Sequence, residues 1–220
     1  MLRLASSSPR RIALVRALAI DAEIVAADLD ETKFASPATA KAEAVARKDH
    51  VTIAADTQLE CEGDRVNKPT DPGDAVTMLA DLVSRGTHDA RTEVAVIDAA
   101  GRRQRFAVRT RVQMGRASLR EIEHYVSTGE PLDKAGGYAI QGEGARLVES
   151  LEGCYANITG LPLCHVYFAL RRAGVVTRER PEVVCQRHFD FVCPVWRIAQ
   201  RQGRALRADG EYRSWRDEVG

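Results

Sequence analysis

The chain has 220 residues, which suits one ample domain, or one domain with an appendage, and is long enough to bury a real core. A hydrophobic fraction of 45% and a charged fraction of 29% are those of an ordinary globular protein in water. The formal net charge of +1 gives no overall field that would attract nucleic acid or an anionic membrane, so an anionic ligand has to be bound locally.

The sequence also bears on cellular compartment. No apolar run reaches the roughly eighteen residues that a membrane-spanning helix needs, and the first residues do not resemble a signal peptide. The five cysteines are an odd number at irregular spacing with no C-x-x-C pair, which argues against a disulfide framework. We therefore expect a cytoplasmic protein with reduced thiols.

Apolar runs predict five strands, and helical periodicity predicts helices between them. Strands and helices alternate over the first part of the chain, and two neighbouring strands that look antiparallel follow, so the pattern predicts a mixed α/β sheet. The predicted strands are 2–6, 24–29, 51–55, 93–98 and 105–114. The predicted helices are one that begins at Pro9 and those over 38–48, 74–84, 118–127 and 161–173.

The segment "LASSSPRR", residues 4–11, joins the first predicted strand to the first predicted helix. Serine is a favoured N-cap and proline suits the first helical position, so Ser8 and Pro9 indicate a helix start. A helix start exposes unpaired N–H groups and the positive end of the helix dipole, and Arg10 and Arg11 add two permanent charges. The segment is typical of a phosphate site, or else of an ordinary helix start with solvated arginines.

Three further polar groups lie where predicted elements end. Asp56 of "AADT" follows an apolar strand, where a carboxylate can orient a metal-bound water, act as a base or cap the next turn. The acidic pair Asp30 and Glu31 either supplies another metal-facing carboxylate or forms a solvated turn. Lys68, beside the stiffening Pro69, can project an ammonium group toward a phosphate.

The segment "GEPLDKAGGYAIQGEGA", residues 129–145, contains five glycines and an isolated apolar stretch followed by Gln141. Packing of side chains in a hydrophobic core does not explain this composition. It is typical of a loop whose backbone must come close to a ligand. Gln141 offers both a donor and an acceptor, as the recognition of a base edge requires.

The segments "SSSPRR", "AADT", "KP", "GEPLDKAGGYAIQGEGA" and "YANITGLPL", in this order, resemble the Maf-type (septum-formation inhibitor) nucleoside triphosphate pyrophosphatases over about residues 2–173. The resemblance implies an α/β fold of the Maf/inosine triphosphatase-like type, with a mixed twisted sheet flanked by helices and a deep nucleotide-binding cleft. It also implies a Mg²⁺- or Mn²⁺-dependent hydrolysis of a nucleoside triphosphate to the monophosphate and pyrophosphate, and a homodimer.

The resemblance assigns roles to individual residues. Ser7, Arg10 and Arg11 match the phosphate-binding motif of the family, and Asp56 matches its proposed catalytic base. An arginine after the proline, together with "AGGYAIQG", is similar to the subgroup that acts on dTTP and UTP. A pyrimidine nucleotide or a modified one is therefore the expected substrate.

The remaining charged positions of the family match Glu31, Lys41 and Lys68, which are expected to line the cleft. On this basis Glu31 and Asp56 would hold the divalent cation, and the basic side chains would bind the triphosphate. Gln141 would contact the base.

The resemblance gives a Maf-like nucleotide pyrophosphatase domain over residues 1–174 and a basic C-terminal extension of unknown role over 175–220. The extension could contact a nucleic acid or a partner surface, but a solvated arginine-rich segment is the more usual explanation. Two other functions remain open: a catalytically weak nucleotide-binding or regulatory protein of cell division, and a nucleotidyltransferase. The latter class favours a glycine-rich opening turn, whereas this turn is serine-rich.

Overall fold

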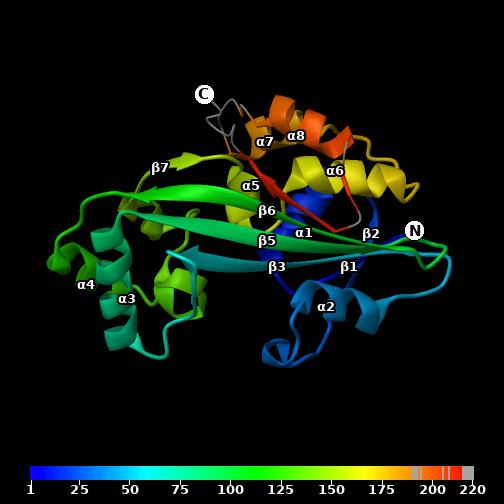
Figure 1. The fold of residues 1–220 in the computed structure, drawn as a ribbon. Helices are drawn as coiled ribbons and strands as arrows, with labels where there is room; N and C mark the ends of the chain where they lie inside the picture. Colours follow the sequence, from blue (N-terminus) through cyan, green and yellow to red (C-terminus); the bar gives the residue numbers. More distant parts are fainter. Residues whose placement is uncertain (190–192, 194, 205, 208, 215–220) are drawn as a thin grey trace. The chain divides into compact units, whose positions relative to one another are not determined.

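The computed structural model describes the chain except residues 190–192, 194, 205, 208 and 215–220 (Figure 1). The chain divides into two compact units. The first unit comprises Met1–Thr57, Thr92–Arg109 and Cys154–Gly220, and the second comprises Gln58–Arg91 and Thr110–Gly153. Three long strands contribute residues to both units: β3 (Val51–Cys61), β5 (Thr87–Ile97) and β6 (Arg103–Met114).

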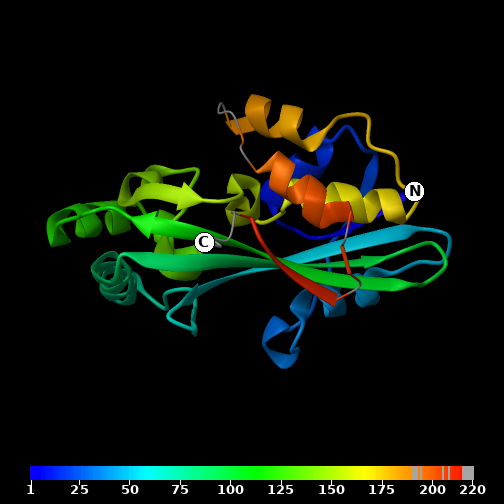
Figure 2. The same ribbon diagram turned by 45° about the horizontal axis from the view of Figure 1, so that its top comes forward.

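The described strands form one mixed sheet in the order β2-β1-β3-β5-β6-β7, with β4 paired to β3 and β8 paired to β6. In the first unit β1 (Leu2–Ala5) runs parallel to both β2 (Ala22–Val25) and β3. The strand β8 (Asp209–Arg213) runs parallel to β6 and lies beside it in both views (Figure 2). The predicted mixed α/β fold is confirmed.

Helices cover both faces of the sheet in the first unit. On one face α2 (Pro37–Val45) packs against Ala5, Ala54 and Ala95 (Figure 1). The larger core lies on the other face, where Leu4, Ile53 and Val96 contact the helices. Successive residues of a strand point to opposite faces, so neighbours such as Leu4 and Ala5 serve different cores. The helices of the larger core are α1 (Pro9–Ala17), α5 (Tyr155–Thr159), α6 (Leu163–Arg172), α7 (Pro181–Phe189) and α8 (Trp196–Arg204).

Serine side chains mark the starts of three helices. Ser8 caps α1 and Ser36 caps α2, each with a proline directly after it. Ser118 caps α4 (Leu119–Ser127) in a capping box with Glu121, in which each residue bonds the other's backbone N–H. These bonds satisfy N–H groups that the helix itself leaves without partners. The helix start predicted at Pro9 is confirmed, and the helix predicted from residue 118 begins one residue later, at Leu119, with Ser118 as its cap.

The second unit combines the far ends of the long strands with short elements. β4 (Asp64–Val66) and β7 (Val148–Glu152) are antiparallel to β3 and β6 respectively. The strongly amphipathic helix α3 (Pro72–Arg85) buries Ala75, Leu79 and Leu82 and packs against α4. Between α4 and β7 lie three short 3₁₀ helices, η2 (Glu130–Asp133), η3 (Ala135–Gly137) and η4 (Glu143–Leu147).

Several predicted elements differ in extent, among them the strand predicted over 93–98, which begins at Thr87 and ends at Ile97 as β5. The second strand ends at Val25 instead of residue 29, because its parallel partner β1 ends at Ala5, which pairs with Val25. The helix predicted to reach residue 48 ends at Val45, since Ala46 has an extended backbone. The strand predicted over 51–55 continues to Cys61, because β4 pairs with its second half.

The segment after residue 174 contributes to the core of the first unit. Val184 and Cys185 of α7, Ala199 of α8, and Val195 and Leu206 are all buried in the larger core. The gaps at 190–192, 194, 205, 208 and 215–220 lie outside the described residues, so the predicted extension is described only in part.

The cysteines are present as thiols, as expected. All five cysteines are free, and four of them are buried. Within the described ranges, no helix combines the length and the apolar character that crossing a membrane would require.

His165 of α6 provides a test of the packing of the first unit by pH. Its Nε2 lies 2.9 Å from Oε1 of Gln202, and burial lowers the pKa of His165 from 6.5 to about 4. The unfolded chain binds a proton near pH 6.5 while the folded protein does not. The free energy of unfolding therefore decreases as pH falls from about 6.5 to about 4, by at most about 1.4 kcal/mol per pH unit for this group.

We expect His165→Asn to show a shallower loss of stability between pH 6.5 and pH 4 than the parent protein. Urea unfolding at a series of pH values measures this slope. His124→Asn, at an exposed histidine of α4, is the matched control and should keep the parent's slope. Equal slopes for His165→Asn and the parent would contradict the burial of a neutral imidazole.

Candidate functional site

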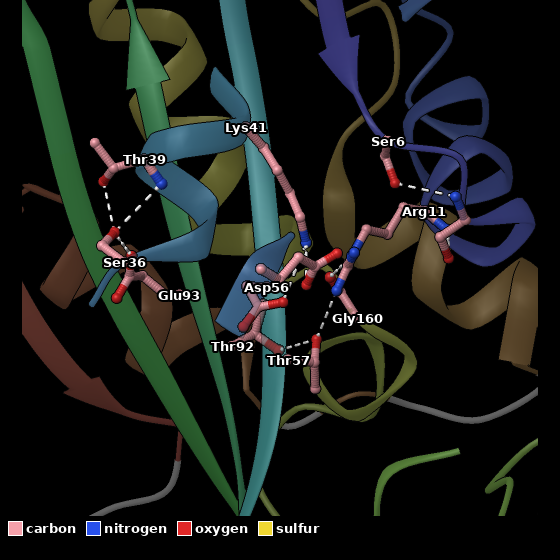
Figure 3. A network of polar contacts seen from close by, with 12 residues as sticks. Ser6, Arg11, Ser36, Thr39, Lys41, Asp56, Thr57, Thr92, Glu93 and Gly160 are labelled. Atoms are coloured by element: carbon pink, nitrogen blue, oxygen red, sulfur yellow. Dashed lines mark hydrogen bonds and ion pairs between the residues drawn. The ribbon is translucent and has the colours of Figure 1, made fainter. Parts of the chain in front are cut away.

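The turn between β1 and α1 presents serines and arginines at a helix start (Figure 3). Ser8 Oγ accepts a hydrogen bond from the Arg11 backbone N–H at 3.5 Å, and Ser6 Oγ accepts one from the Ser8 N–H at 3.1 Å. Ser6 is buried, whereas Ser7 and Arg10 are exposed. The buried serine therefore shapes the turn, and the exposed side chains are accessible to an anion in solution.

Arg11 is fixed by two neutral acceptors. Its Nε donates to the Gly160 carbonyl at 2.9 Å, and its Nη2 donates to Thr57 Oγ1 at 3.1 Å (Figure 3). Burial lowers the pKa of Arg11, while the charges of Asp56 and Glu31 act in the opposite direction. A guanidinium remains protonated in proteins, so Arg11 is an oriented positive charge in the field of these two carboxylates.

The hydroxyl groups of Thr57 and Thr92 connect Arg11 to the Asn157 carbonyl. Thr92 Oγ1 donates to the Asn157 carbonyl at 2.9 Å, and Thr57 Oγ1 lies 2.9 Å from Thr92 Oγ1. Because the Thr92 proton is directed to the carbonyl, the Thr57 hydroxyl donates to Thr92 and accepts from Arg11. The donor of each hydrogen bond from Arg11 through Thr57 and Thr92 to Asn157 is thus determined. These bonds fix the Thr57 side chain.

Lys41 lies between two carboxylates. Its Nζ is 2.8 Å from Oε2 of Glu31 and 3.2 Å from Oδ1 of Asp56. Lys41 and Asp56 are each only 7% exposed, while the side chain of Glu31, in η1 (Glu31–Lys33), is half-exposed. A buried carboxylate is costly without a partner of opposite charge, so the Lys41 ammonium compensates for the burial of Asp56.

The alternation of β3 explains why these side chains meet. Asp56 has the same parity as Ala54, which packs against α2, and α2 carries Lys41. Thr57 has the opposite parity and reaches Arg11 of α1. The prediction that Asp56 ends its strand is wrong, since β3 continues to Cys61. The motif "AADT" instead supplies one side chain to each face of a continuous strand.

The structure brings together four of the predicted site residues in the first unit: Arg11, Glu31, Lys41 and Asp56. Lys68 and Gln141 belong to the second unit, where both are exposed, Lys68 in the loop between β4 and α3 and Gln141 in the turn between η3 and η4. The roles assigned to these two residues remain predictions.

Sequence reasoning missed several partners of Arg11. Thr57 belongs to the quoted motif "AADT", and Gly160 belongs to "YANITGLPL", so both motifs were visible. Nothing in the sequence indicated that Arg11 and Gly160, 149 positions apart, are hydrogen-bonded. Ser6 was likewise not distinguished from its neighbours, because only its burial separates it from Ser7.

The carboxylates Glu31 and Asp56 provide a limited set of metal ligands. Among the described residues there is no group of three or more His, Cys, Asp or Glu side chains arranged to hold a metal ion. Mg²⁺ is usually held by one or two carboxylates together with waters and substrate phosphates. The two carboxylates therefore fit a hard cation that binds together with an anionic ligand, and they do not fit a permanent metal enclosed by protein side chains.

Comparison with known proteins gives consistent matches. A family model described as "Maf-like protein" matches residues 1–173. The "dTTP/UTP pyrophosphatase" of Geotalea uraniireducens is 44% identical over 189 residues, which are 79% of this chain and 95% of that protein. The proteins of the same name from Syntrophomonas wolfei and Myxococcus xanthus are each 43% identical, covering 78% and 80% of this chain and 96% and 93% of their own.

A solved structure also aligns with part of the chain. The Staphylococcus aureus Ham1 protein has a TM-score of 0.41 and 15% sequence identity, and the alignment covers 52% of this chain and 71% of that chain.

Removal of the Lys41 ammonium tests its role beside Asp56. Lys41→Met removes the ammonium group that contacts the buried Asp56 carboxylate, and we expect a loss of about 3–5 kcal/mol in the free energy of unfolding. The double variant Lys41→Met/Asp56→Asn removes both charges and should recover most of this loss. Urea unfolding at neutral pH measures each variant.

The matched control is Lys33→Met, at an exposed lysine that pairs with Asp30 across 3.2 Å. Exposed ion pairs contribute at most about 1 kcal/mol, so this variant should remain near the parent. A Lys41→Met protein as stable as the Lys33→Met protein would show that Lys41 does not compensate for Asp56.

Proposed function

The chain belongs to the Maf family, and from this premise we propose that it hydrolyses dTTP and UTP, or modified pyrimidine nucleotides, to the monophosphate and pyrophosphate. The names of relatives at 43–44% identity over more than three quarters of the chain support this activity. The observation in this chain that carries the proposal is the contact of the Lys41 ammonium with both Glu31 and Asp56, in the field of Arg11.

We propose that the triphosphate binds at the start of α1. Three features of this place favour an anion: the N–H groups and dipole of the helix start, the exposed Ser7 hydroxyl, and the Arg10 guanidinium. Arg11 and Lys41 add positive charge from inside the site. A triphosphate carries several negative charges. Hydrogen bonds from these donors and positive groups would offset the cost of removing it from water.

Asp56 is proposed as the general base. Water attacks the α-phosphorus, its proton passes to the Asp56 carboxylate, and the bond from the α-phosphorus to the bridging oxygen breaks with its electron pair leaving on pyrophosphate. Lys41 keeps the Asp56 carboxylate in position through its contact with Oδ1. General-base catalysis of this kind contributes about 10²–10⁴-fold.

We propose Mg²⁺ or Mn²⁺ as the cofactor, held by Glu31 and Asp56 when the nucleotide is bound. When bound, the cation would neutralise charge on the phosphoryl oxygens. Binding of the cation would require Lys41 to share its two carboxylate partners with it.

For the second unit we propose that Lys68 contacts the phosphates as a point charge and that Gln141 recognises the base. Both side chains are exposed, as contact with a ligand requires. The motif similarity around "KP" and "AGGYAIQG" supports these roles.

We also propose that the protein acts as a homodimer in the cytoplasm, on the basis of its family and of the nucleotide pool that it would use. Light scattering on the purified protein should give twice the 24.2 kDa of the chain. A mass equal to one chain would contradict the dimer.

Asp56→Asn is expected to lower kcat for dTTP about 100-fold or more, because the amide cannot accept the proton of the attacking water. Pyrophosphate release, measured with an inorganic pyrophosphatase and a phosphate dye, gives the rate. Circular dichroism confirms that the variant is folded. Release at the parent's rate by Asp56→Asn would refute its role as base.

A panel of dTTP, UTP, dCTP, dGTP and ATP tests the proposed choice of base. We expect the parent to prefer dTTP and UTP, and Gln141→Ala to reduce this preference about tenfold through lost hydrogen bonds to the base. Gln186→Ala, at an exposed position of α7 in the first unit, is the control and should keep the parent's preference.

The same panel separates the other functions. Thermal stabilisation by nucleotide without release of pyrophosphate would indicate a binding protein. Consumption of nucleotide only after a sugar phosphate is added would indicate a nucleotidyltransferase.

A further inference from the structure

Gln141 lies in a tight turn of the second unit. The turn begins at Ala139 and is closed by a hydrogen bond from the Gly142 N–H to the Ala139 carbonyl at 3.2 Å, so that Ile140 and Gln141 form its middle. Ile140 is buried and Gln141 is exposed, which directs the two middle side chains to different environments. The position of Gln141 therefore depends on what holds the two ends of this turn.

Tyr125 holds the first end. It comes from α4 and is only 5% exposed. Its Oη accepts a hydrogen bond from the Ala139 backbone N–H at 3.1 Å. The same hydroxyl donates a hydrogen bond to the carboxylate of Glu130. Burial is the main cause of the raised pKa of Tyr125, and this hydrogen bond is the second cause. One hydroxyl thus connects the start of the turn to Glu130.

Glu130 holds the other end. It is the first residue of η2, and its Oε2 accepts a hydrogen bond from the Gly144 backbone N–H at 3.0 Å. Gly144 lies two residues after the end of the turn. Tyr125 and Glu130, bonded to each other, therefore bind the backbone on both sides of Gln141, and we refer to them as the Tyr125–Glu130 pair.

The glycines on this side of the turn fit tightly against the pair. A Cβ atom at Gly142 would lie 1.8 Å from Oε1 of Glu130. A Cβ atom at Gly144 would lie 2.5 Å from the Tyr125 hydroxyl and 2.9 Å from the Ala139 nitrogen. The sequence suggested that these glycines allow close approach to a ligand, but at these two positions the close neighbours are side chains and backbone of the protein itself.

We propose that the Tyr125–Glu130 pair positions Gln141 and thereby sets the base selectivity of the enzyme. This inference rests on the proposed role of Gln141 in base recognition. Neither residue needs to touch the substrate, because the Tyr125 hydroxyl binds the Ala139 N–H and the Glu130 carboxylate binds the Gly144 N–H. They are positioning residues, and their loss should affect the choice of nucleotide more than the rate of the chemical step.

Tyr125→Phe removes only the hydroxyl, and Glu130→Ala removes the carboxylate. We expect each to reduce the preference for dTTP over dGTP in kcat/KM by about five- to tenfold, mainly through KM, with kcat for dTTP changed less than about threefold. Glu130→Gln keeps the shape and an oxygen acceptor for the Gly144 N–H, and it should retain most of the parent's preference.

Hydrogen exchange of backbone amides, measured by NMR, gives a second readout independent of activity. The Ala139 and Gly144 amides should exchange about tenfold faster or more in Tyr125→Phe and Glu130→Ala, because each loses part of the hydrogen bonding that protects the turn. Glu121→Ala is the matched control: it breaks the capping box of the same helix without contacting the turn. It should lower stability while leaving nucleotide preference and the relative protection of these two amides unchanged.

The outcomes separate this inference from the function on which it rests. A parent protein that releases no pyrophosphate from dTTP or UTP refutes the proposed function, and the amide exchange then decides whether the pair holds the turn. A selective parent whose preference and amide protection are both unchanged in Tyr125→Phe and Glu130→Ala overturns the inference. Equal loss of preference in Glu121→Ala would also overturn it, because general destabilisation of α4 would then explain the effect.

Discussion

The ammonium group of Lys41 is the constraint on which the candidate site depends. Burial of Asp56 inside a strand would be costly for an isolated carboxylate, and Lys41 offsets that cost from α2 while it also binds the more exposed Glu31. Both acidic groups thereby contact the same ammonium group. Stability and proposed catalysis therefore depend on one ion-paired cluster.

Strand β3 connects this cluster to the start of α1, where we propose that the triphosphate binds. Asp56 points to the face covered by α2, and Thr57 points to the opposite face, where it accepts a hydrogen bond from Arg11. The start of α1 is thus tied to the acidic cluster through neighbouring residues of a single strand. In the second unit a different device, the Tyr125–Glu130 pair, holds the backbone around Gln141. Charge compensation shapes one part and backbone hydrogen bonding shapes the other.

Local signals in the sequence predicted much of this arrangement. Ser8 and Pro9 marked the start of α1, and the motif resemblance named Arg11, Glu31, Lys41 and Asp56, which the structure brings together. Contacts between distant segments, such as Arg11 with Gly160, have no local pattern and were missed. The end of β2 depends on its pairing partner β1. Glycine is required at 142 and 144 because Glu130 and Tyr125 leave no room for a side chain there.

The site of attack on the nucleotide tests the central claim most directly. Hydrolysis of dTTP in ¹⁸O-labelled water, followed by mass spectrometry of the products, shows which phosphorus receives the water oxygen. Attack at the α-phosphorus by a water that Asp56 activates predicts label in dTMP and none in pyrophosphate. Label in pyrophosphate, or release of orthophosphate as the first product, would contradict the account.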